Sequence, residues 1–276
     1  MLPEAFVYSQ TSLQDFTDCP ALFDLRWRQR IKYPAAESEP LELVEAHMER
    51  GALFHQMIHQ HLIGVPENVI AESIDDDELG AWWANYLASG LRGLPAARHP
   101  EITLSVPIAG RRMVAKLDVL AVDAGRESVI VDWKTSLHRP TRANLLARLQ
   151  TVVYRYVLVE AGAYLNGGTP VDPAQVKMIY WFANFANQPE IFTYSADEHA
   201  AAGAMLTQMI SDIERRGDGD FPLTDDVRRC VYCSYRGLHE RGTKAGDFEA
   251  QEIGLTDELS DAFPDFTLDQ IAEVAF

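Results

Sequence analysis

Apolar and polar residues alternate along residues 115–136 (AKLDVLAVDAGRESVIVDWKTS), on both sides of a short turn that contains Asp123 and Gly125. A period of two is typical of paired β-strands, whose side chains point alternately to the two faces of a sheet. Gly110 and Gly125 are well placed to form the turns between three successive strands. We expect these strands at about 101–108, 112–122 and 128–135.

Other segments carry apolar residues at the spacing that indicates helices. We expect helices at 9–33 with an interruption at Pro20, 42–63, 76–92, 141–159 and 197–215, and further strands at 175–183 and 190–194. The chain has 276 residues, of which 47% are hydrophobic, so it can bury one large core. The pattern predicts an α/β fold in which helices flank a mixed central β-sheet.

We expect one elaborated domain over residues 1–276, made of five segments. They are 1–40 with a helix and the first cysteine, 41–100 with helices and His55, 101–195 with the core that carries the candidate chemistry, 196–246 with a helix and a CxxC segment, and an acidic tail at 247–276. The tail also contains apolar residues, so we expect a helix at about 267–275 that docks on the body. The alternative is a nucleic-acid mimic that covers a basic channel.

The central hairpin gathers charged residues if its turn is centred on Gly125. Residues whose numbers sum to 250 then face each other, so Asp118 lies opposite Asp132 and Lys116 lies opposite Lys134. Side chains two positions apart share a face, which places Asp118, Asp132 and Lys134 together. The other face is expected to carry the apolar set, Leu117, Val119, Ala121, Val129, Val131 and Trp133.

Two carboxylates that face each other destabilise a sheet unless something compensates their charge. A divalent cation is a natural compensation, because Mg²⁺ binds oxygen ligands, usually one or two carboxylates together with water and substrate phosphate. Such a metal activates water and stabilises charge on a phosphate, and a lysine beside it can hold that water or neutralise the developing oxyanion. The alternative is a surface hairpin with solvated charges, because a DxK triplet on a strand is common.

Two neighbouring helices carry polar residues that favour the metal site. Residues 50–62 (RGALFHQMIHQHL) include His55, and residues 141–159 (TRANLLARLQTVVYRYVLV) include Gln150 and Tyr154, which are four apart and share a helix face. Two of these residues also have an ordinary interpretation, His55 as a half-buried helix histidine and Tyr154 as part of the core.

Gly51-x3-His55, Asp118, Asp132-x-Lys134 and Gln150-x3-Tyr154 follow in an order and spacing that resemble the motifs of RecB-type nucleases of the PD-(D/E)XK superfamily. The resemblance runs from residues 8–27 to residues 241–248 and implies a restriction-endonuclease-like core. It implies that Asp118 and Asp132 bind Mg²⁺ or Mn²⁺, with His55 at the edge of the metal and the Trp133 carbonyl as a further ligand. It also implies that Lys134 positions the attacking water, and that Gln150 and Tyr154 orient the active site and the bound strand.

The three cysteines, Cys19, Cys230 and Cys233, suggest a second metal site. An odd count without a secretory leader argues for a reducing compartment and against a disulfide framework. In the iron–sulfur subfamily of RecB-type nucleases, one early cysteine and a CxxC-x5-C segment hold a [4Fe–4S] cluster, and here His239 stands at the last cysteine position. The resemblance implies a cluster on these four residues that staples the first helix to the end of the domain. A structural zinc ion and a vestigial site are the alternatives.

The formal net charge of −17 argues by itself against a nucleic-acid partner. Positive residues nevertheless gather in three islands, at 26–32, 139–155 and 228–244, each beside a candidate functional element. Because phosphate contacts need only local lysine and arginine, we expect the islands to line a strand-binding channel rather than to form merely solvated faces. The candidate nucleic-acid-binding residues are Arg26, Arg28, Arg30, Arg139, Arg142, Arg148, Arg236 and Arg241, with Trp27, Tyr232 and Tyr235 as candidates for stacking on unpaired bases.

These observations favour a metal-dependent DNA nuclease that hydrolyses phosphodiester bonds, and within that class an exonuclease that acts on single strands or ends in repair or recombination. Two alternatives stay open: a catalytically silent module that binds DNA or a helicase partner, and a CRISPR-associated RecB-type exonuclease. The sequence has no apolar run of about 18 residues that could span a membrane. With no signal peptide, it predicts a cytoplasmic protein without a membrane partner.

Overall fold

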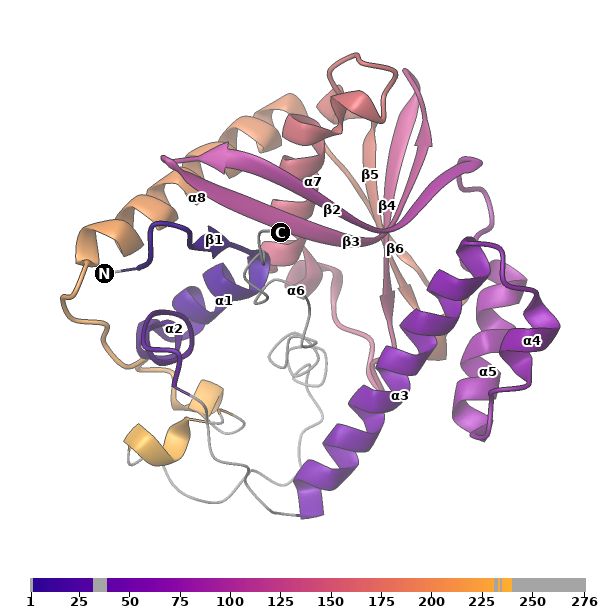
Figure 1. The fold of residues 1–276 in the computed structure, drawn as a ribbon, viewed down its shortest axis with the longest axis horizontal. Coiled ribbons are helices and arrows are strands. Elements are labelled where there is room, and N and C mark those ends of the chain that lie inside the picture. The colour runs from indigo at the N-terminus through magenta and orange to yellow at the C-terminus, as the bar shows by residue number, and fades with distance from the viewer. Residues whose placement is uncertain (1, 32–38, 231–232, 234, 240–276) are drawn as a thin grey trace, which may run out of the picture.

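The computed structural model describes residues 2–31, 39–230, 233 and 235–239, and it centres on a six-stranded mixed β-sheet (Figure 1). The strands are β1 (Val7–Tyr8), β2 (Ala97–Ile108), β3 (Arg111–Asp123), β4 (Glu127–Lys134), β5 (Val176–Phe182) and β6 (Glu190–Thr193). Their order is β1-β3-β4-β5-β6, with β2 also paired to β3. The β1–β3 and β4–β5 pairs are parallel and the other pairs are antiparallel, which confirms the predicted mixed sheet.

Helices precede, connect and follow these strands. The α-helices are α1 (Gln10–Asp18), α2 (Pro20–Phe23), α3 (Glu39–Leu62), α4 (Glu67–Ala71), α5 (Asp77–Asn85), α6 (Arg142–Ala147), α7 (Leu149–Ala161) and α8 (Ala196–Arg216). Two π-helical segments extend α2 and α5, Asp24–Arg28 and Tyr86–Gly90. Short 3-10 helices lie at Gly162–Tyr164, Pro173–Gln175, Ala183–Phe185, Val227–Cys230 and Arg236–His239.

Local backbone conformation explains where two predicted helices were too long. The segment expected at 141–159 forms two helices, because Arg148 has an extended backbone (φ −67°, ψ 137°) between α6 and α7. The segment expected at 9–33 ends its helical part at Arg28, and Arg30 adopts a left-handed φ of 53°. Strand β1 and helix α4 were not expected from the sequence.

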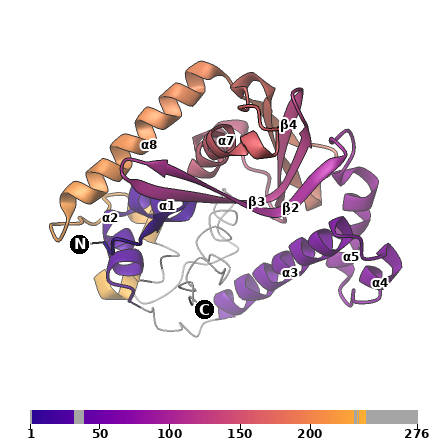
Figure 2. The same cartoon turned by 45° about the horizontal axis from the view of Figure 1, so that its top comes forward.

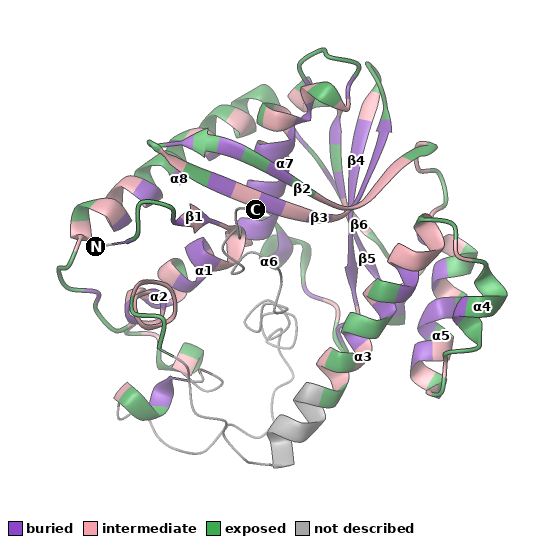
Figure 3. Cartoon of the chain, in the orientation of Figure 1, coloured by how far each residue is buried: buried purple, intermediate pink, exposed green. Residues whose placement is uncertain are grey.

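Each face of the sheet packs against helices and has its own apolar core, as Figure 2 shows with α7 and α8 on one side and α3, α4 and α5 on the other. The larger core joins the sheet to α1, α7 and α8 through residues such as Leu13, Val153 and Leu206. The smaller core joins it to α3 and α5 through residues such as Phe54 and Trp82. Strand β4 is therefore buried along nearly its whole length (Figure 3).

The register of the central hairpin agrees with the prediction. Cα partners run from Val119↔Val131 to Asp123↔Glu127, so each pair sums to 250, and Gly125 supplies the left-handed turn residue at φ 77°. The expected apolar face was wrong at one position. Leu117 packs in the larger core, whereas the other five residues of that set, Val119, Ala121, Val129, Val131 and Trp133, pack in the smaller one.

The reason lies in an interruption of the neighbouring β2–β3 ladder. Its pairs run from Ala97↔Val122 to Ile108↔Arg111, but the rung at Glu101 and Asp118 is missing. Glu101 has a left-handed backbone with φ 53°, which an L-residue adopts only when its surroundings impose it. Leu117 and Val119, on either side of this point, pack in different cores, although the register of the ladder is the same before and after it. Tyr232, Arg241 and the helix expected at 267–275 lie outside the described residues.

Candidate active site

Strands β3 and β4 stop pairing at the point where the candidate residues begin. The last paired residues are Val119 and Val131, and the next pair would be Asp118 with Asp132. Instead of a backbone rung, Oδ2 of Asp118 accepts a hydrogen bond of 2.9 Å from the Trp133 backbone N–H. The end of the hairpin therefore leaves two carboxylates at the parting of the strands, one of them tied to the neighbouring strand.

Three side chains from three different elements converge around Asp118. The ligand atoms of His55 on α3, Glu101 on β2 and Asp118 on β3 all lie within 4.8 Å of one another. The His55 Nδ1 atom is 3.5 Å from Asp118 Oδ2, and all three side chains are half-buried. Two carboxylates and an imidazole in reach of one point form a donor set that a divalent cation can use. We call these three residues the ligand group.

Glu101 is the member of the ligand group that the sequence analysis missed. A signal was available, because the β2–β3 turn pairs Ile108 with Arg111 and the same arithmetic places Glu101 opposite Asp118. The Lys116 ammonium forms an ion pair with the Glu101 carboxylate from the adjacent strand. The missing rung thus coincides with the two carboxylates of the group.

The charge of Asp118 is poorly compensated within the protein. Burial, together with the nearby Glu101 carboxylate, raises the pKa of Asp118 to about 7, although the Trp133 N–H, Lys134 and Lys116 act in the opposite direction. A cation in contact with this carboxylate would favour its ionised form. The elevated pKa is what a ligand site between like charges has before a cation binds.

A second set of residues surrounds Asp132, and its members are much more deeply buried. Asp132 is 2% exposed and Lys134 is 6% exposed, and the Lys134 Nζ atom lies 3.1 Å from Asp132 Oδ2. The Gln150 amide donates to Asp132 Oδ1 over 2.8 Å and contacts the Tyr154 hydroxyl at 3.3 Å. We call Asp132, Lys134, Gln150 and Tyr154 the buried group.

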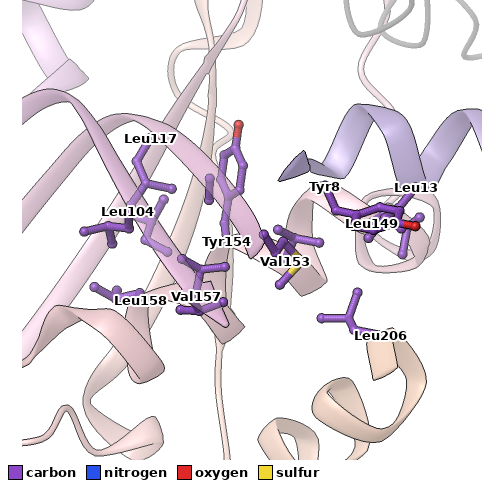
Figure 4. Packing of buried hydrophobic residues seen from close by; sticks show 14 of the residues in the cluster. Tyr8, Leu13, Leu104, Leu117, Leu149, Val153, Tyr154, Val157, Leu158 and Leu206 are labelled. Atoms are coloured by element: carbon purple, nitrogen blue, oxygen red, sulfur yellow. The ribbon is translucent and has the colours of Figure 1, made fainter. Parts of the chain in front are cut away.

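Tyr154 packs in the core, and its hydroxyl also accepts a hydrogen bond from Gln150. Its ring belongs to the larger core, and Figure 4 shows it beside Leu117 with the hydroxyl end pointing away from Val157 and Leu158. Burial raises the pKa of Tyr154 well above its usual value, and Asp132 and Asp118 raise it further. The phenol is therefore a neutral hydrogen-bonding group beside both carboxylates.

Helix α3 approaches the end of β4 closely. A methyl group on Gly51 would lie 3.0 Å from the Thr135 Oγ1 atom, which is tighter than ordinary packing. Thr135 directly follows Lys134, and His55 is one helical turn after Gly51. A residue without a side chain at position 51 thus lets α3 present His55 to Asp118.

The three cysteines approach one another across the chain but do not form a metal-ligand set. Burial raises the pKa of the Cys233 thiol, with smaller contributions in the same direction from Cys19 and Cys230. Among the described residues, however, no three Cys or His ligand atoms lie within 4.8 Å of one another, although His239 is described too. Four bonds of about 2.3 Å to one zinc ion would bring the sulfur atoms closer than that. The geometry supports neither the predicted [4Fe–4S] cluster nor a preformed zinc site.

Four of the eight arginines expected to bind phosphate have acidic partners within the protein. Arg26 lies 2.9 Å from Asp15, Arg28 contacts Asp24 and Asp218, and both Arg139 and Arg142 contact Glu190. Arg148 is half-buried, Arg236 is buried and Arg30 is exposed, while Arg241 is outside the described residues. The islands are therefore less positive than their sequences indicate.

Two of the aromatic residues expected to stack on bases make contacts within the protein. Trp27 packs against the larger core and its indole N–H donates to Asp15 over 2.7 Å. Tyr235 is 2% exposed and its hydroxyl donates to the Ile31 carbonyl over 2.7 Å. The Tyr235 ring is therefore covered by tertiary packing, whereas Trp27 is half-buried.

Comparisons with known proteins add evidence independent of this geometry. A family model described as the PD-(D/E)XK nuclease superfamily matches residues 7–238. Among solved structures, the chain is similar to a crystal structure titled "Putative exonuclease" from Eubacterium rectale, with a TM-score of 0.51 and 12% identity, over 92% of this chain and 93% of that one. It also aligns with the structure of SSO0001 at a TM-score of 0.40 and 13% identity, over 86% of this chain and 87% of that one.

At such identities these likenesses concern the fold alone, and the second is too weak to support an argument. No curated protein matches the chain. In the part of the chain that the structure describes, no helix is both long and apolar enough to cross a membrane.

Proposed function

The chain belongs to the PD-(D/E)XK nuclease superfamily, and from that premise we propose that it is a Mg²⁺- or Mn²⁺-dependent deoxyribonuclease. One observation carries the proposal: the ligand group and the buried group meet where β3 and β4 part, so acidic ligands and a lysine lie at one end of the hairpin. A metal-dependent hydrolase of phosphodiester bonds needs this combination.

The residues present fit a hard divalent cation. The ligand group offers two carboxylates and one imidazole, and the oxygen donors suit Mg²⁺ or Mn²⁺. Asp132 is the natural further ligand, because its carboxylate is at the end of β4 that adjoins Asp118. When bound, the metal supplies charge stabilisation at the phosphate and lowers the pKa of water.

The protein side chains supply the rest of the proposed chemistry. Lys134 carries a positive charge 3.1 Å from Asp132, where it can donate to an attacking water or to a phosphate oxygen. Gln150 holds Asp132 through its amide N–H, so the carboxylate keeps one orientation. Tyr154 remains protonated and can donate a hydrogen bond beside the same carboxylates.

For the substrate we propose DNA single strands or ends, in exonucleolytic cleavage during repair or recombination. The set of motif residues, from His55 to Tyr154, supports an enzyme over a silent module that holds DNA or a helicase partner. A CRISPR-associated RecB-type exonuclease would use the same residues, so the genomic neighbourhood is the observation that separates that alternative.

For the cysteines, a [4Fe–4S] cluster with His239 as fourth ligand has the family resemblance as its only support, because the described residues form no preformed ligand set. A visible absorption spectrum and metal analysis of anaerobically purified protein test it. Iron and sulfide in equal amounts, with absorbance in the visible, would support the cluster. Zinc without visible absorbance would support a structural zinc ion instead. The absence of both iron and zinc would argue against any metal at these residues.

The test of the nuclease is cleavage of labelled single-stranded DNA with Mg²⁺ or Mn²⁺ and without metal. We expect cleavage by the wild type with metal only, and none by Asp132→Ala or Lys134→Ala. The matched controls are Asp123→Ala and Lys177→Ala, since both residues are on the exposed turn side of the sheet. If the folded protein binds DNA but cleaves no strand type in the presence of metal, the nuclease proposal is wrong. The catalytically silent module would then be the better function.

A further inference from the structure

A second lysine of the site, Lys116, contacts the ligand group from β3. Its Cα partner on β2 is Thr103, and its ammonium reaches diagonally to the carboxylate of Glu101, two residues earlier on β2. Asp118, two residues later on β3, is close to the same carboxylate. Glu101 therefore has an attractive partner, Lys116, and a repulsive one, Asp118, on the same neighbouring strand.

The two lysines near Asp118 differ in exposure. The Lys134 side chain is 7% exposed and lies 3.1 Å from Asp132, while the Lys116 side chain is 41% exposed. Burial raises the pKa of Asp118 and both lysines act in the opposite direction, so the charge of Lys116 reaches this second carboxylate too. Lys116 is therefore the lysine of the pair that is more accessible to a ligand in solution.

Another ion pair in the sheet has the same geometry but lies at the other end of β4. Lys177 on β5 has Val129 on β4 as its Cα partner and lies 2.8 Å from Glu127, again two residues earlier on the neighbouring strand. The Lys177 side chain is 46% exposed. Surface pairs of this kind contribute little to stability. What distinguishes Lys116 is that its partner, Glu101, belongs to the ligand group.

The attraction between Lys116 and Glu101 depends on the charge of the ligand group. With both carboxylates ionised the group carries two negative charges, and a divalent cation cancels them, so Lys116 then loses most of its attraction to Glu101. A lysine ammonium is strongly hydrated and sits on a flexible stem, which lets Lys116 turn toward solvent without disturbing the backbone pairing. A strand held at the ligand group brings phosphates to this surface, and a phosphate is a suitable new partner for the ammonium.

We propose that Lys116 is a substrate-binding residue that exchanges partners. It pairs with Glu101 in the metal-free protein, and it pairs with a phosphate of the bound strand when the ligand group holds a divalent cation. The substrate in this proposal rests on the proposed nuclease function. The exchange itself is measured through metal binding and DNA binding, so it does not depend on cleavage.

The first test measures metal affinity by calorimetric titration with Mn²⁺. Lys116→Met keeps the length of the side chain and removes its charge. Because the ammonium then no longer competes for Glu101, we expect the variant to bind Mn²⁺ about fivefold more tightly than the wild type. Lys116→Arg keeps the charge and should bind Mn²⁺ like the wild type. The control is Lys177→Met, which breaks the matched pair with Glu127 and should leave Mn²⁺ affinity unchanged.

The second test measures binding of a labelled DNA single strand by fluorescence anisotropy, at saturating Ca²⁺ and with a chelator. Ca²⁺ binds carboxylate oxygens as Mg²⁺ does. We expect Lys116→Met to weaken DNA binding about tenfold with Ca²⁺ and to change it little with the chelator. With Ca²⁺, the slope of log K against log salt should also become shallower by about 0.7, the amount for one phosphate contact on a single strand. Lys116→Arg and Lys177→Met should bind DNA like the wild type in both conditions.

The outcomes separate the exchange from the nuclease proposal. A loss of DNA binding in Lys116→Met that is equal with Ca²⁺ and with the chelator would overturn the exchange, because the contact would then not depend on a cation. Mn²⁺ affinity and DNA binding equal to those of Lys177→Met would overturn it as well. If the wild type shows the Ca²⁺-dependent contribution of Lys116 but cleaves no strand type, the nuclease proposal is wrong and the exchange stands. If the wild type cleaves DNA and Lys116→Met cleaves it with the same KM, the exchange is wrong and the nuclease proposal stands.

Discussion

The ligand group and the buried group adjoin each other but are held in place by different means. His55, Glu101 and Asp118 come from three elements, are half-buried and leave the Asp118 carboxylate with a pKa raised to about 7. Asp132 and Lys134 come from one strand, are almost fully buried and have hydrogen-bonding or ionic partners already in place.

The difference indicates which half is organised by the protein and which half needs a cation. A buried ion pair with additional hydrogen bonds is expensive to disrupt, because a single charge left in the interior loses its compensation. A half-buried cluster of two carboxylates and a histidine is instead relieved of repulsion when a cation binds. Variants of the two groups should therefore respond differently in stability, metal affinity and pH dependence.

The largest effect is expected from Lys134→Ala. The cleavage rate should fall by at least about 100-fold, as when a charge-stabilising donor is removed from an active site. The metal-free protein should lose roughly 3 kcal/mol of unfolding free energy, because Asp132 keeps its amide partner but loses the ammonium. Denaturant unfolding and cleavage assays measure both, with Lys177→Ala as the exposed control. If Lys134→Ala and Lys177→Ala were equally stable, the inference that the protein itself organises the buried group would be wrong.

An intermediate effect is expected from Glu101→Gln. Removing one negative ligand should weaken Mn²⁺ binding by at least about tenfold, since ligand charge sets the affinity of such sites. Calorimetric titration of the metal measures this, and Glu127→Gln on the exposed end of β4 is the control. The stability of the metal-free protein should not fall, in contrast to Lys134→Ala. Unchanged Mn²⁺ affinity would remove Glu101 from the ligand group.

The smallest effect concerns the pH dependence of stability in the metal-free protein. The folded pKa of Asp118, about 7, is above the ordinary value of 3.8, so between these values the folded state retains a proton that the unfolded state has lost. The unfolding free energy should therefore fall as pH rises from about 4 to about 7. Asp118→Asn keeps an acceptor for the Trp133 N–H and should flatten this fall, so that the variant gains stability relative to the wild type as pH rises. A steeper fall in the variant than in the wild type would contradict the charge repulsion inferred for the ligand group.

Much of the sheet and of the hairpin could be predicted from the sequence, because both depend on short-range patterns. Turns at Gly110 and Gly125 and a period of two were enough to place three strands and the register at Val119↔Val131. Glu101 could also have been found in this way, because the register of the β2–β3 turn places it opposite Asp118. It could not foresee the missing rung at Asp118, because the left-handed backbone of Glu101 comes from its surroundings and not from its residue type.

The basic islands show the opposite case. Arg139 and Arg142 are close together in sequence and look like a phosphate-binding surface, but both contact Glu190, which is on β6. Arg26 is likewise paired with Asp15 on the preceding helix, and the Trp27 indole N–H donates a hydrogen bond to the same carboxylate. Charge counted along a chain therefore overestimated the charge available to a ligand.

The sequence by itself determined the order of the motif residues, the strands that carry Asp118, Asp132 and Lys134, and the register of their hairpin. These follow from backbone geometry, since a tight turn and the alternation of side chains act over a few residues. Only the tertiary structure decided that Glu101 joins Asp118 and His55, that Tyr180 contacts Gln150, and that four of the eight candidate arginines are paired with carboxylates. Those outcomes depend on charges and hydrogen-bond donors that meet through space, and residues far apart in sequence become neighbours only when the sheet and its helices have packed.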